Sequence, residues 1–419
     1  MLKQNKQGNK VFYGWTIVSI VLFANYISIG TGFYIFNAFM EPLCQAKAWS
    51  RTDINLGIAG GMLSASIASF CYGMVVTKVG PRILMTVGPF VSGTAFIFLF
   101  QANNLLQFTL WCIVLFAANA AFGTLVTGTV VNNWFIEKRG RALGIATIGF
   151  SLSGASLPLL AMLILHNTDI ITSTRIIGFT IMLVGPLSWI FVRNWPETYG
   201  LQPDGKEKKS IANSLDQISL ENNDIWTAKR IFLSGNFWKI GAVYICAMMV
   251  LTGTMTQLKP RFTSQGFSDL EAMIMMAITA LIGVFGKVFW GYMCDKYDPK
   301  KVIAFFLASN SLGISFSLIP NSLTATILFI LIFGFAVGGA SGTYPIVVSY
   351  YFGRRSFPIV MKYISLFLML NLIGLVIDGQ SFDRFGSYDP AYIFFMALDF
   401  CAIFIMLSVK SPGDRKLVF

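Results

Sequence analysis

The sequence predicts an all-α membrane protein in which twelve transmembrane helices form two pseudo-symmetric six-helix bundles. Composition is the first observation behind this prediction. Hydrophobic residues make up 55% of the chain and charged residues 12%, against about 25% charged residues in a soluble domain. A soluble protein with so few charges could not cover its surface with polar groups, so we expect most of the chain to lie in a lipid bilayer.

The second observation is an internal repeat. Residues 73–78 (Gly-Met-Val-Val-Thr-Lys) return 218 residues later as residues 291–296 (Gly-Tyr-Met-Cys-Asp-Lys). Residues 133–139 contain Asn-Trp-Phe and then Lys-Arg, and residues 350–355 repeat this pattern as Tyr-Tyr-Phe and then Arg-Arg. Each copy lies where a long apolar run gives way to a basic turn. A duplicated hydrophobic unit of this size is typical of secondary transporters, which bind substrate between the two halves.

Individual spans follow from the turn and charge signals along the chain. A bilayer core needs about 20 apolar residues per helix. The first run has no short apolar stretch followed by a small-residue cleavage site, so we expect it to stay in the membrane. Five runs exceed the length of a bilayer, which indicates tilt or extension beyond the lipid. The predicted spans are residues 12–43, 52–76, 83–101, 105–134, 141–166, 170–192, 237–264, 268–294, 301–319, 323–351, 358–385 and 389–409.

The long polar stretch 193–236 divides the chain into an N-terminal bundle (1–192) and a C-terminal bundle (237–419). This linker has too little apolar content for a core of its own. We therefore favour a flexible tether that lets the halves rock over a regulatory domain. Residues 227–233 form the exception, because they read as a short amphipathic helix capped by Thr227.

Basic residues predict the orientation and explain the net charge of +12. If both termini are cytoplasmic, 24 of the 31 Lys and Arg residues fall in cytoplasmic segments, 6 in outer segments, and Lys287 within a span. Cytoplasmic loops carry such an excess, so we expect a protein of the plasma (inner) membrane with both termini and the linker on the cytoplasmic side. The basic residues lie at the ends of apolar runs, which favours lipid as the partner and excludes a nucleic acid. The six cysteines form no CxxC pair, so neither disulfides nor a metal site are indicated.

Three motifs resemble one family. Residues 73–82 (Gly-Met-Val-Val-Thr-Lys-Val-Gly-Pro-Arg) resemble the loop between helices 2 and 3 of the major facilitator superfamily. Residues 134–149 are similar to the helix 4–5 signature of its monocarboxylate transporter branch, and residues 12–15 (Phe-Tyr-Gly-Trp) to that branch's N-terminal motif. The resemblance implies a twelve-helix fold with a central cavity and no cofactor.

In that superfamily, acidic and basic groups of these loops latch the inner gate. The family's usual aspartate is replaced by Thr77 in the first half, and the second half retains it as Asp295. The departure at Thr77 puts the strength of the first latch in doubt. The basic residues could instead only mark the cytoplasmic side. The candidate gating residues are Lys78, Arg82, Lys138, Arg139, Arg141, Asp295 and Lys296.

Lys287 is the leading candidate for substrate binding. It lies eight residues before Asp295, which is about 12 Å deeper along a helix, near the middle of the bilayer core. An ammonium there costs about 2.5–3.5 kcal/mol or more, so we expect it to face a cavity; the alternative is a lysine that snorkels to the inner interface. The resemblance places it where the monocarboxylate and oxalate/formate transporters carry a carboxylate-binding arginine. One turn earlier, Gly283 replaces the proton-coupling aspartate of animal members, so proton symport through that pair is not supported.

Other polar residues could complete an anion pocket. Asp378 is another ionisable residue deep in a predicted span, and could act as counter-charge to Lys287 or as a proton carrier. Alternatively, it lies near the outer end of its span and is in contact with water there. Four further residues can donate hydrogen bonds to a carboxylate or serve only in helix packing. These four candidates are Tyr34, Asn119, Tyr344 and Asn371.

These observations together predict a transporter rather than an enzyme. The expected substrate is a small organic anion, a mono- or short dicarboxylate, which crosses by alternating access through a carrier that works as a monomer. Protons or a counter-anion are both open as coupling partners. An exporter of larger amphipathic compounds is the main alternative, since the 39 Phe and 18 Met could line an apolar cavity. Two other classes are alternatives to a transporter. A membrane enzyme would need His, Cys or acidic groups that converge on one place. A non-transporting receptor would bind its ligand without carrying out counterflow.

Overall fold

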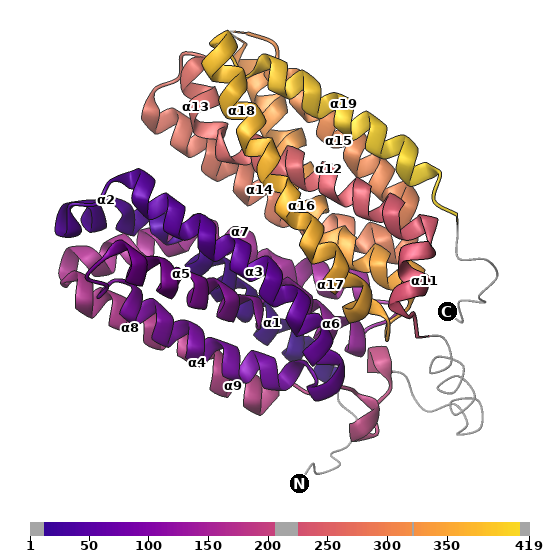
Figure 1. Cartoon of the computed structure of the whole chain (residues 1–419). Helices are drawn as coiled ribbons and strands as arrows, with labels where there is room; N and C mark the ends of the chain where they lie inside the picture. Colours follow the sequence, from indigo (N-terminus) through magenta and orange to yellow (C-terminus); the bar gives the residue numbers. More distant parts are fainter. Residues whose placement is uncertain (1–11, 206–224, 321, 411–419) are drawn as a thin grey trace.

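The computed structural model describes residues 12–205, 225–320 and 322–410. Two bundles of long helices lie side by side, one from the first half of the chain and one from the second (Figure 1). The described secondary structure is entirely helical, as predicted. The bundles are joined at one end by residues 193–205 and α11 (Ala228–Leu233), which we call the linker end; the opposite end, near α2 (Phe36–Lys47) and α13 (Leu258–Ser264), is the far end.

The N-terminal bundle corresponds closely to the first six predicted spans. The first span forms α1, a π-helical turn at Gly30–Tyr34 and then α2. The fourth and sixth spans are each divided in two. The remaining helices are α1 (Tyr13–Ile29), α3 (Arg51–Val79), α4 (Pro81–Leu99), α5 (Leu105–Ala120), α6 (Thr124–Trp134), α7 (Arg139–Asn167), α8 (Ile170–Met182) and α9 (Val184–Phe191).

The C-terminal bundle repeats this plan. The eleventh predicted span is interrupted at Leu368–Asn371 by a 3-10 turn, which separates α17 from α18. The seventh predicted span is divided into α12 and the short α13, and the other spans form helices that match their predicted bounds to within a few residues. These helices are α12 (Gly235–Thr256), α14 (Asp269–Lys296), α15 (Pro299–Ser317), α16 (Leu323–Phe352), α17 (Phe357–Phe367), α18 (Leu372–Phe385) and α19 (Asp389–Leu407).

Eleven of the twelve predicted spans form helical segments long and apolar enough to cross a bilayer, counted over the described ranges. The ninth forms α15, a helix of 19 residues. Its sequence includes Lys300, Lys301 and Asn310, which lower its apolar character. Helix starts follow the local sequence: Ser50 and Ser268 each form a capping box with the acidic residue three positions later, which satisfies backbone N–H groups that the helix leaves free.

Glycines let the two bundles touch at the linker end. A Cβ on Gly140 of α7 would collide with the carbonyl oxygen of Gly291 on α14, and a Cβ on Gly144 with that of Lys287. On the other side of the interface, Gly73 of α3 lies against the backbone of Pro358 on α17. Small residues that allow close backbone approach are the main route to helix packing in lipid. The duplicated glycines of the sequence repeat are therefore the contact points between the halves.

The beginning of the linker packs against the N-terminal bundle. The carboxylate of Asp204 accepts hydrogen bonds from the backbone nitrogens of Ile136 and Glu137, both at 2.9 Å, and of Lys138 at 3.1 Å. The Trp134 indole donates to the Arg193 carbonyl oxygen at 2.8 Å. Residues 193–205 thus hold the α6–α7 turn in place, and a tether along the whole linker remains a prediction for residues outside the described ranges. The predicted helix 227–233 is present as α11 with Thr227 as its cap.

Candidate functional site

Lys287 bridges the two bundles from a position about two thirds of the way along α14. Its side chain is buried, with 3% of the residue exposed. The ammonium donates hydrogen bonds to the Thr147 carbonyl oxygen at 3.0 Å and to Ser151 Oγ at 2.7 Å, and it lies 5.5 Å from the centre of the Phe150 ring. All three partners are on α7 of the opposite bundle. Lys287 therefore does not snorkel to the interface; it crosses from one half to the other.

This arrangement leaves the charge of Lys287 incompletely compensated. Within the described residues Lys287 forms no ion pair, and its two acceptors are a neutral carbonyl and a neutral hydroxyl. An ammonium has three donors, so two such bonds leave capacity for a third acceptor. A buried charge is expensive unless it is paired. The ammonium can therefore take one more hydrogen-bond acceptor at this place.

A small cavity adjoins the same segment of α7. It lies between α1, α6, α7 and Pro345 of α16, and Thr147 and Phe150 are in its wall. The space open to the centre of a water molecule is about 10 Å³, enough for about one water. Asn25 donates to the Ala146 carbonyl oxygen at 2.9 Å and accepts from Thr127 at 3.0 Å. The conformation described is therefore closed around this point.

The two predicted pocket tyrosines lie on elements next to this region. The ring of Tyr34 packs on Gly154, where an added Cβ would lie 2.9 Å from Tyr34 Cζ; Gly154 is three residues after Ser151 on α7. Tyr344 is buried and stacks on Tyr244 with ring centroids 3.3 Å apart. Its hydroxyl has no hydrogen-bond partner among the described residues, and the next residue, Pro345, lines the cavity. Both tyrosines are placed on elements that surround the Lys287 contact.

The structure does not bring the two predicted asparagines to Lys287. Asn119 accepts from Ser92 Oγ at 2.7 Å and donates to Thr31 Oγ1 at 3.4 Å, so its amide is engaged inside the N-terminal bundle. Asn371 is the last residue of the 3-10 turn between α17 and α18 and is partly exposed. Asn119 serves helix packing in this conformation, and Asn371 marks the break in the eleventh span.

Asp378 also lies apart from Lys287. It is fully buried on α18 and interacts electrostatically with Arg261 of α13 and Tyr392 of α19. The partners of Lys287 are on α7 instead. The structure therefore does not assemble the predicted pair of Asp378 with Lys287, because the two residues face different neighbours.

Of the predicted gating residues, Asp295 and Arg141 meet across the halves. The Asp295 carboxylate at the end of α14 accepts from the backbone nitrogens of Gly140 at 2.5 Å and Arg141 at 3.0 Å, and from Arg141 Nε at 3.2 Å. These nitrogens belong to the first turn of α7, where a helix leaves its N–H groups free and its dipole favours negative charge. Asp295 thus caps a helix of the opposite bundle and latches the linker end.

The remaining predicted gating residues make contacts within one bundle. Arg82 donates to the Trp189 carbonyl oxygen at 2.6 Å and lies over the Trp189 ring. Arg139 Nε donates to the Phe135 carbonyl oxygen at 3.2 Å in its own half. Lys296 lies 5.6 Å from the ring of Tyr297. Lys138 contributes its backbone nitrogen to Asp204, and the exposed Lys78 shows no described contact across the halves.

Thr77 is the first-half counterpart of Asp295 and lies on α3. Its hydroxyl donates to the Met74 carbonyl oxygen at 2.7 Å within α3, so it does not reach the other bundle. A second cross-bundle contact comes from a residue that sequence reasoning missed: Arg354 donates to the Asn133 carbonyl oxygen at 2.6 Å and to Glu197 Oε1 at 2.8 Å. The signal for it was present, since Arg354 and Arg355 are the repeat partners of Lys138 and Arg139.

Sequence reasoning also missed Thr147, Phe150 and Ser151. The run of glycine and serine at residues 149–154 (Gly-Phe-Ser-Leu-Ser-Gly) is the local signal, because small polar residues in a span mark a helix face that meets another helix. Their pairing with Lys287 requires the three-dimensional arrangement of α7 and α14, which lie far apart in the sequence.

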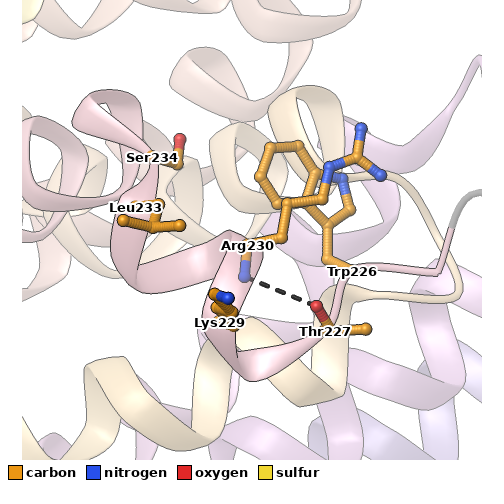
Figure 2. A pocket seen from close by; sticks show the side chains of 6 residues that line it. All are labelled: Trp226, Thr227, Lys229, Arg230, Leu233 and Ser234. Atoms are coloured by element: carbon orange, nitrogen blue, oxygen red, sulfur yellow. Dashed lines mark hydrogen bonds between the residues drawn. The ribbon is translucent and has the colours of Figure 1, made fainter.

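A larger pocket lies at the linker end and is open to its surroundings. Figure 2 shows its lining side chains, with Arg230 beside the Trp226 ring and Lys229 and Leu233 on the same short helix. Its volume is about 470 Å³, and Arg230 lies 4.2 Å from the Trp226 ring centre. The mixture of cations and exposed apolar groups on α11 suits a membrane surface. This pocket belongs to the linker and has no contact with Lys287.

Comparison with known proteins gives a family for this architecture. The sequence profile described as Major Facilitator Superfamily matches residues 22–374. The chain is 21% identical over 341 residues to the agnestins efflux protein of Paecilomyces divaricatus, covering 81% of this chain and 74% of that protein. It is 22% identical over 358 residues to monocarboxylate transporter 2 of Meriones unguiculatus, covering 78% and 69%.

A solved structure shows the same fold. The superfamily's proton:xylose symporter XylE superposes with a TM-score of 0.72 at 12% identity, over 95% of this chain and 96% of that one. The chain belongs to the major facilitator superfamily, whose members are membrane transporters of small molecules.

Proposed function

We propose that this member of the major facilitator superfamily moves a small organic anion, a mono- or short dicarboxylate, across the membrane by alternating access. Lys287 is the charge partner of the carboxylate. Tyr34 and Tyr344 shape the pocket around it, and the protein functions as a monomer. In this proposal the chain belongs with the monocarboxylate-like branch, and the similarity to monocarboxylate transporter 2 supports that placement.

The position of Lys287 is the observation that carries the proposal. A lysine with 3% exposure and no carboxylate partner in the described ranges lies where the two bundles meet. A carboxylate ligand would supply the missing negative charge through a charge-assisted hydrogen bond, which is about twice as strong as a neutral one. Since Ser151 and Thr147 hold the ammonium from the opposite bundle, substrate binding exchanges contacts that join the halves.

Alternating access follows from the same contacts. In the conformation described, Asp295 and Arg354 hold the linker end closed. Opening that end must break these bonds together with the Gly140–Gly291 contact. We place the linker end in the cytoplasm, from the excess of Lys and Arg on that side. An impermeant thiol reagent added outside intact cells should leave a cysteine at the exposed Lys229 unmodified in a variant without native cysteines; modification would reverse the orientation.

Counterflow in proteoliposomes tests the function. Purified protein is reconstituted with a panel of unlabelled small carboxylates inside, and uptake of the labelled carboxylate is measured beside that of its neutral amide. We expect exchange of at least one carboxylate, no exchange of the amide, and loss of exchange in Lys287→Ala. The control is Lys239→Ala, since Lys239 is partly exposed and donates to the Ser408 carbonyl oxygen within one bundle. Exchange at the wild-type rate in Lys287→Ala would refute the proposal.

An exporter of larger amphipathic compounds is the second candidate. The similarity to the agnestins efflux protein supports it. The same vesicles distinguish the two, because an exporter would expel amphipathic dyes and leave small carboxylates in place. Dye transport that persists in Lys287→Ala would favour the exporter.

A further inference from the structure

A cluster of charged and polar groups lies at the far end of the C-terminal bundle, apart from Lys287. Arg261 of α13 is buried and donates to Ser317 Oγ at 3.2 Å and to the Ser317 carbonyl oxygen at 2.5 Å. It also forms an ion pair of 2.6 Å with Asp389 at the start of α19 and lies 5.2 Å from the ring centre of Tyr392. Arg261 therefore joins α13, α15 and α19.

Asp378 is the unusual member of this cluster. It is 0% exposed, and neither of its carboxylate oxygens has a hydrogen-bond partner among the described residues. The buried Tyr392 hydroxyl is likewise without a partner there. An ionised carboxylate without hydrogen bonds in such a place would cost several kcal/mol. A neutral carboxylic acid would not carry that cost.

The charges around Asp378 also favour its neutral, protonated form. The positive charge of Arg261 is already balanced by Asp389, so an ionised Asp378 would give the cluster a net negative charge. Asp383, exposed on the same helix near Tyr388, adds further negative potential. The other packed element, α12, has Lys239 as its one charged residue, near the opposite end of that helix. Lys259 on α13 and Arg384 on α18 are further cations of these helices, but the positive charge that acts on Asp378 among the described residues is that of Arg261.

We propose that Asp378 is a proton-binding site that controls the far end of the C-terminal bundle: its carboxyl carries a proton in this conformation, and ionisation draws Arg261 away from Asp389 and Ser317. The proton leaves to the water at the far end. Because Arg261 fastens α13 to α15 and α19, the change loosens α13. This role does not depend on which substrate is carried, and it differs from the counter-charge to Lys287.

Cysteine accessibility in detergent tests the proposal without substrate. Thr263 on α13 donates only to the Pro260 carbonyl oxygen of its own helix, so Thr263→Cys reports on α13 without joining the cluster. Its maleimide labelling rate is compared, at each pH, between protein with Asp378 and the Asp378→Asn variant, both otherwise free of cysteine. The ratio of the two rates removes the pH dependence of the thiol itself.

We expect a ratio near one in mildly acidic buffer that rises about fivefold or more in alkaline buffer, the usual size of coupling between sites. The matched control is Asp399→Asn, a buried acid that accepts from Asn310 at 2.7 Å; it should label like the parent at every pH. A ratio that stays near one at all pH values would overturn the proposal.

A second variant keeps the test decisive if Asp378→Asn does not fold. Asp389→Asn removes the competitor for Arg261, so the rise in labelling should move to lower pH than in the parent. An unmoved rise would overturn the proposal. The pH profile of carboxylate exchange should follow the labelling profile, and this part rests on the proposed function. If no carboxylate exchanges while labelling behaves as expected, the proposed function fails and the proton site stands.

Discussion

At the scale of single residues, the choice of lysine at position 287 matters. An arginine would present a planar fork that binds a carboxylate through two parallel bonds, whereas lysine offers a compact charge with three donors. The structure uses two of these donors on Thr147 and Ser151. One donor is left for a substrate carboxylate, and a second bond to that carboxylate would have to displace Ser151 or the Thr147 carbonyl oxygen.

Ser151→Ala should strengthen carboxylate binding. The substitution removes one competitor for Lys287 in the substrate-free protein, and a hydrogen bond to a charged group contributes about 1.5–3 kcal/mol. Each 1.4 kcal/mol of this competing interaction that is removed lowers the dissociation constant for the carboxylate by up to about tenfold. We expect to measure this decrease by isothermal titration calorimetry.

The control for this prediction is Ser153→Ala. Ser153 lies two residues further along α7 and donates to the Phe150 carbonyl oxygen of its own helix, so its removal should leave affinity unchanged. Weaker binding in Ser151→Ala would mean that Ser151 contacts the substrate directly.

At the scale of helices, the two copies of the repeat have different latches. The second copy caps α7 with Asp295, whereas the first copy ends in Thr77, which bonds within α3. The first copy meets α17 through apolar and cation–ring contacts instead, with Phe70 against Tyr363 and Lys362 over Phe70. The charged latch is thus on one side of the interface, and opening the linker end depends mainly on Asp295 and Arg354.

Asp295→Asn should open the linker end. The amide loses the charge that stabilises the first turn of α7, at a cost of about 1.5–3 kcal/mol. A cysteine replacing the buried Asn132, one turn after the Gly128 contact with Phe357 of the opposite bundle, should then react with maleimide about tenfold faster.

Asp298→Asn provides the comparison for that experiment. Asp298 lies three residues later and accepts from the backbone nitrogen of Lys300 at the start of its own helix, α15. It should leave the labelling rate unchanged. Equal rates in both variants would show that the Asp295 cap does not hold the halves together.

At the scale of the whole molecule, the sequence allowed the two helical bundles to be predicted. Hydropathy located the spans because a membrane helix must satisfy its own backbone in lipid, and the repeat indicated two halves of similar architecture. Lys287 stood out because a lone cation in an apolar run needs an explanation. These inferences need only the sequence of single segments or the comparison of two segments, and no knowledge of which helices pack together.

The partners of these residues could not be predicted in the same way. Ser151 and Lys287 lie on helices from different halves, and their hydrogen bond depends on the rotation and depth of both. The sequence left Asn119 open as a pocket residue or a helix-packing residue, because a polar residue in a span can face a cavity or its own bundle; in the structure it bonds to Ser92 and Thr31. Asp378 likewise interacts with Arg261 of its own bundle and not with Lys287.

The affinity of Lys287 variants for a carboxylate tests the central claim most directly. A carboxylate that exchanges in vesicles is titrated into wild type, Lys287→Arg and Lys287→Ala in detergent by calorimetry. A hydrogen bond to a charged group contributes about 1.5–3 kcal/mol, so its loss in Lys287→Ala should weaken carboxylate binding about tenfold to a hundredfold. Lys287→Arg should bind with intermediate affinity because it keeps the charge. A dissociation constant in Lys287→Ala equal to that of the wild type would contradict the account and place the anion elsewhere in the protein.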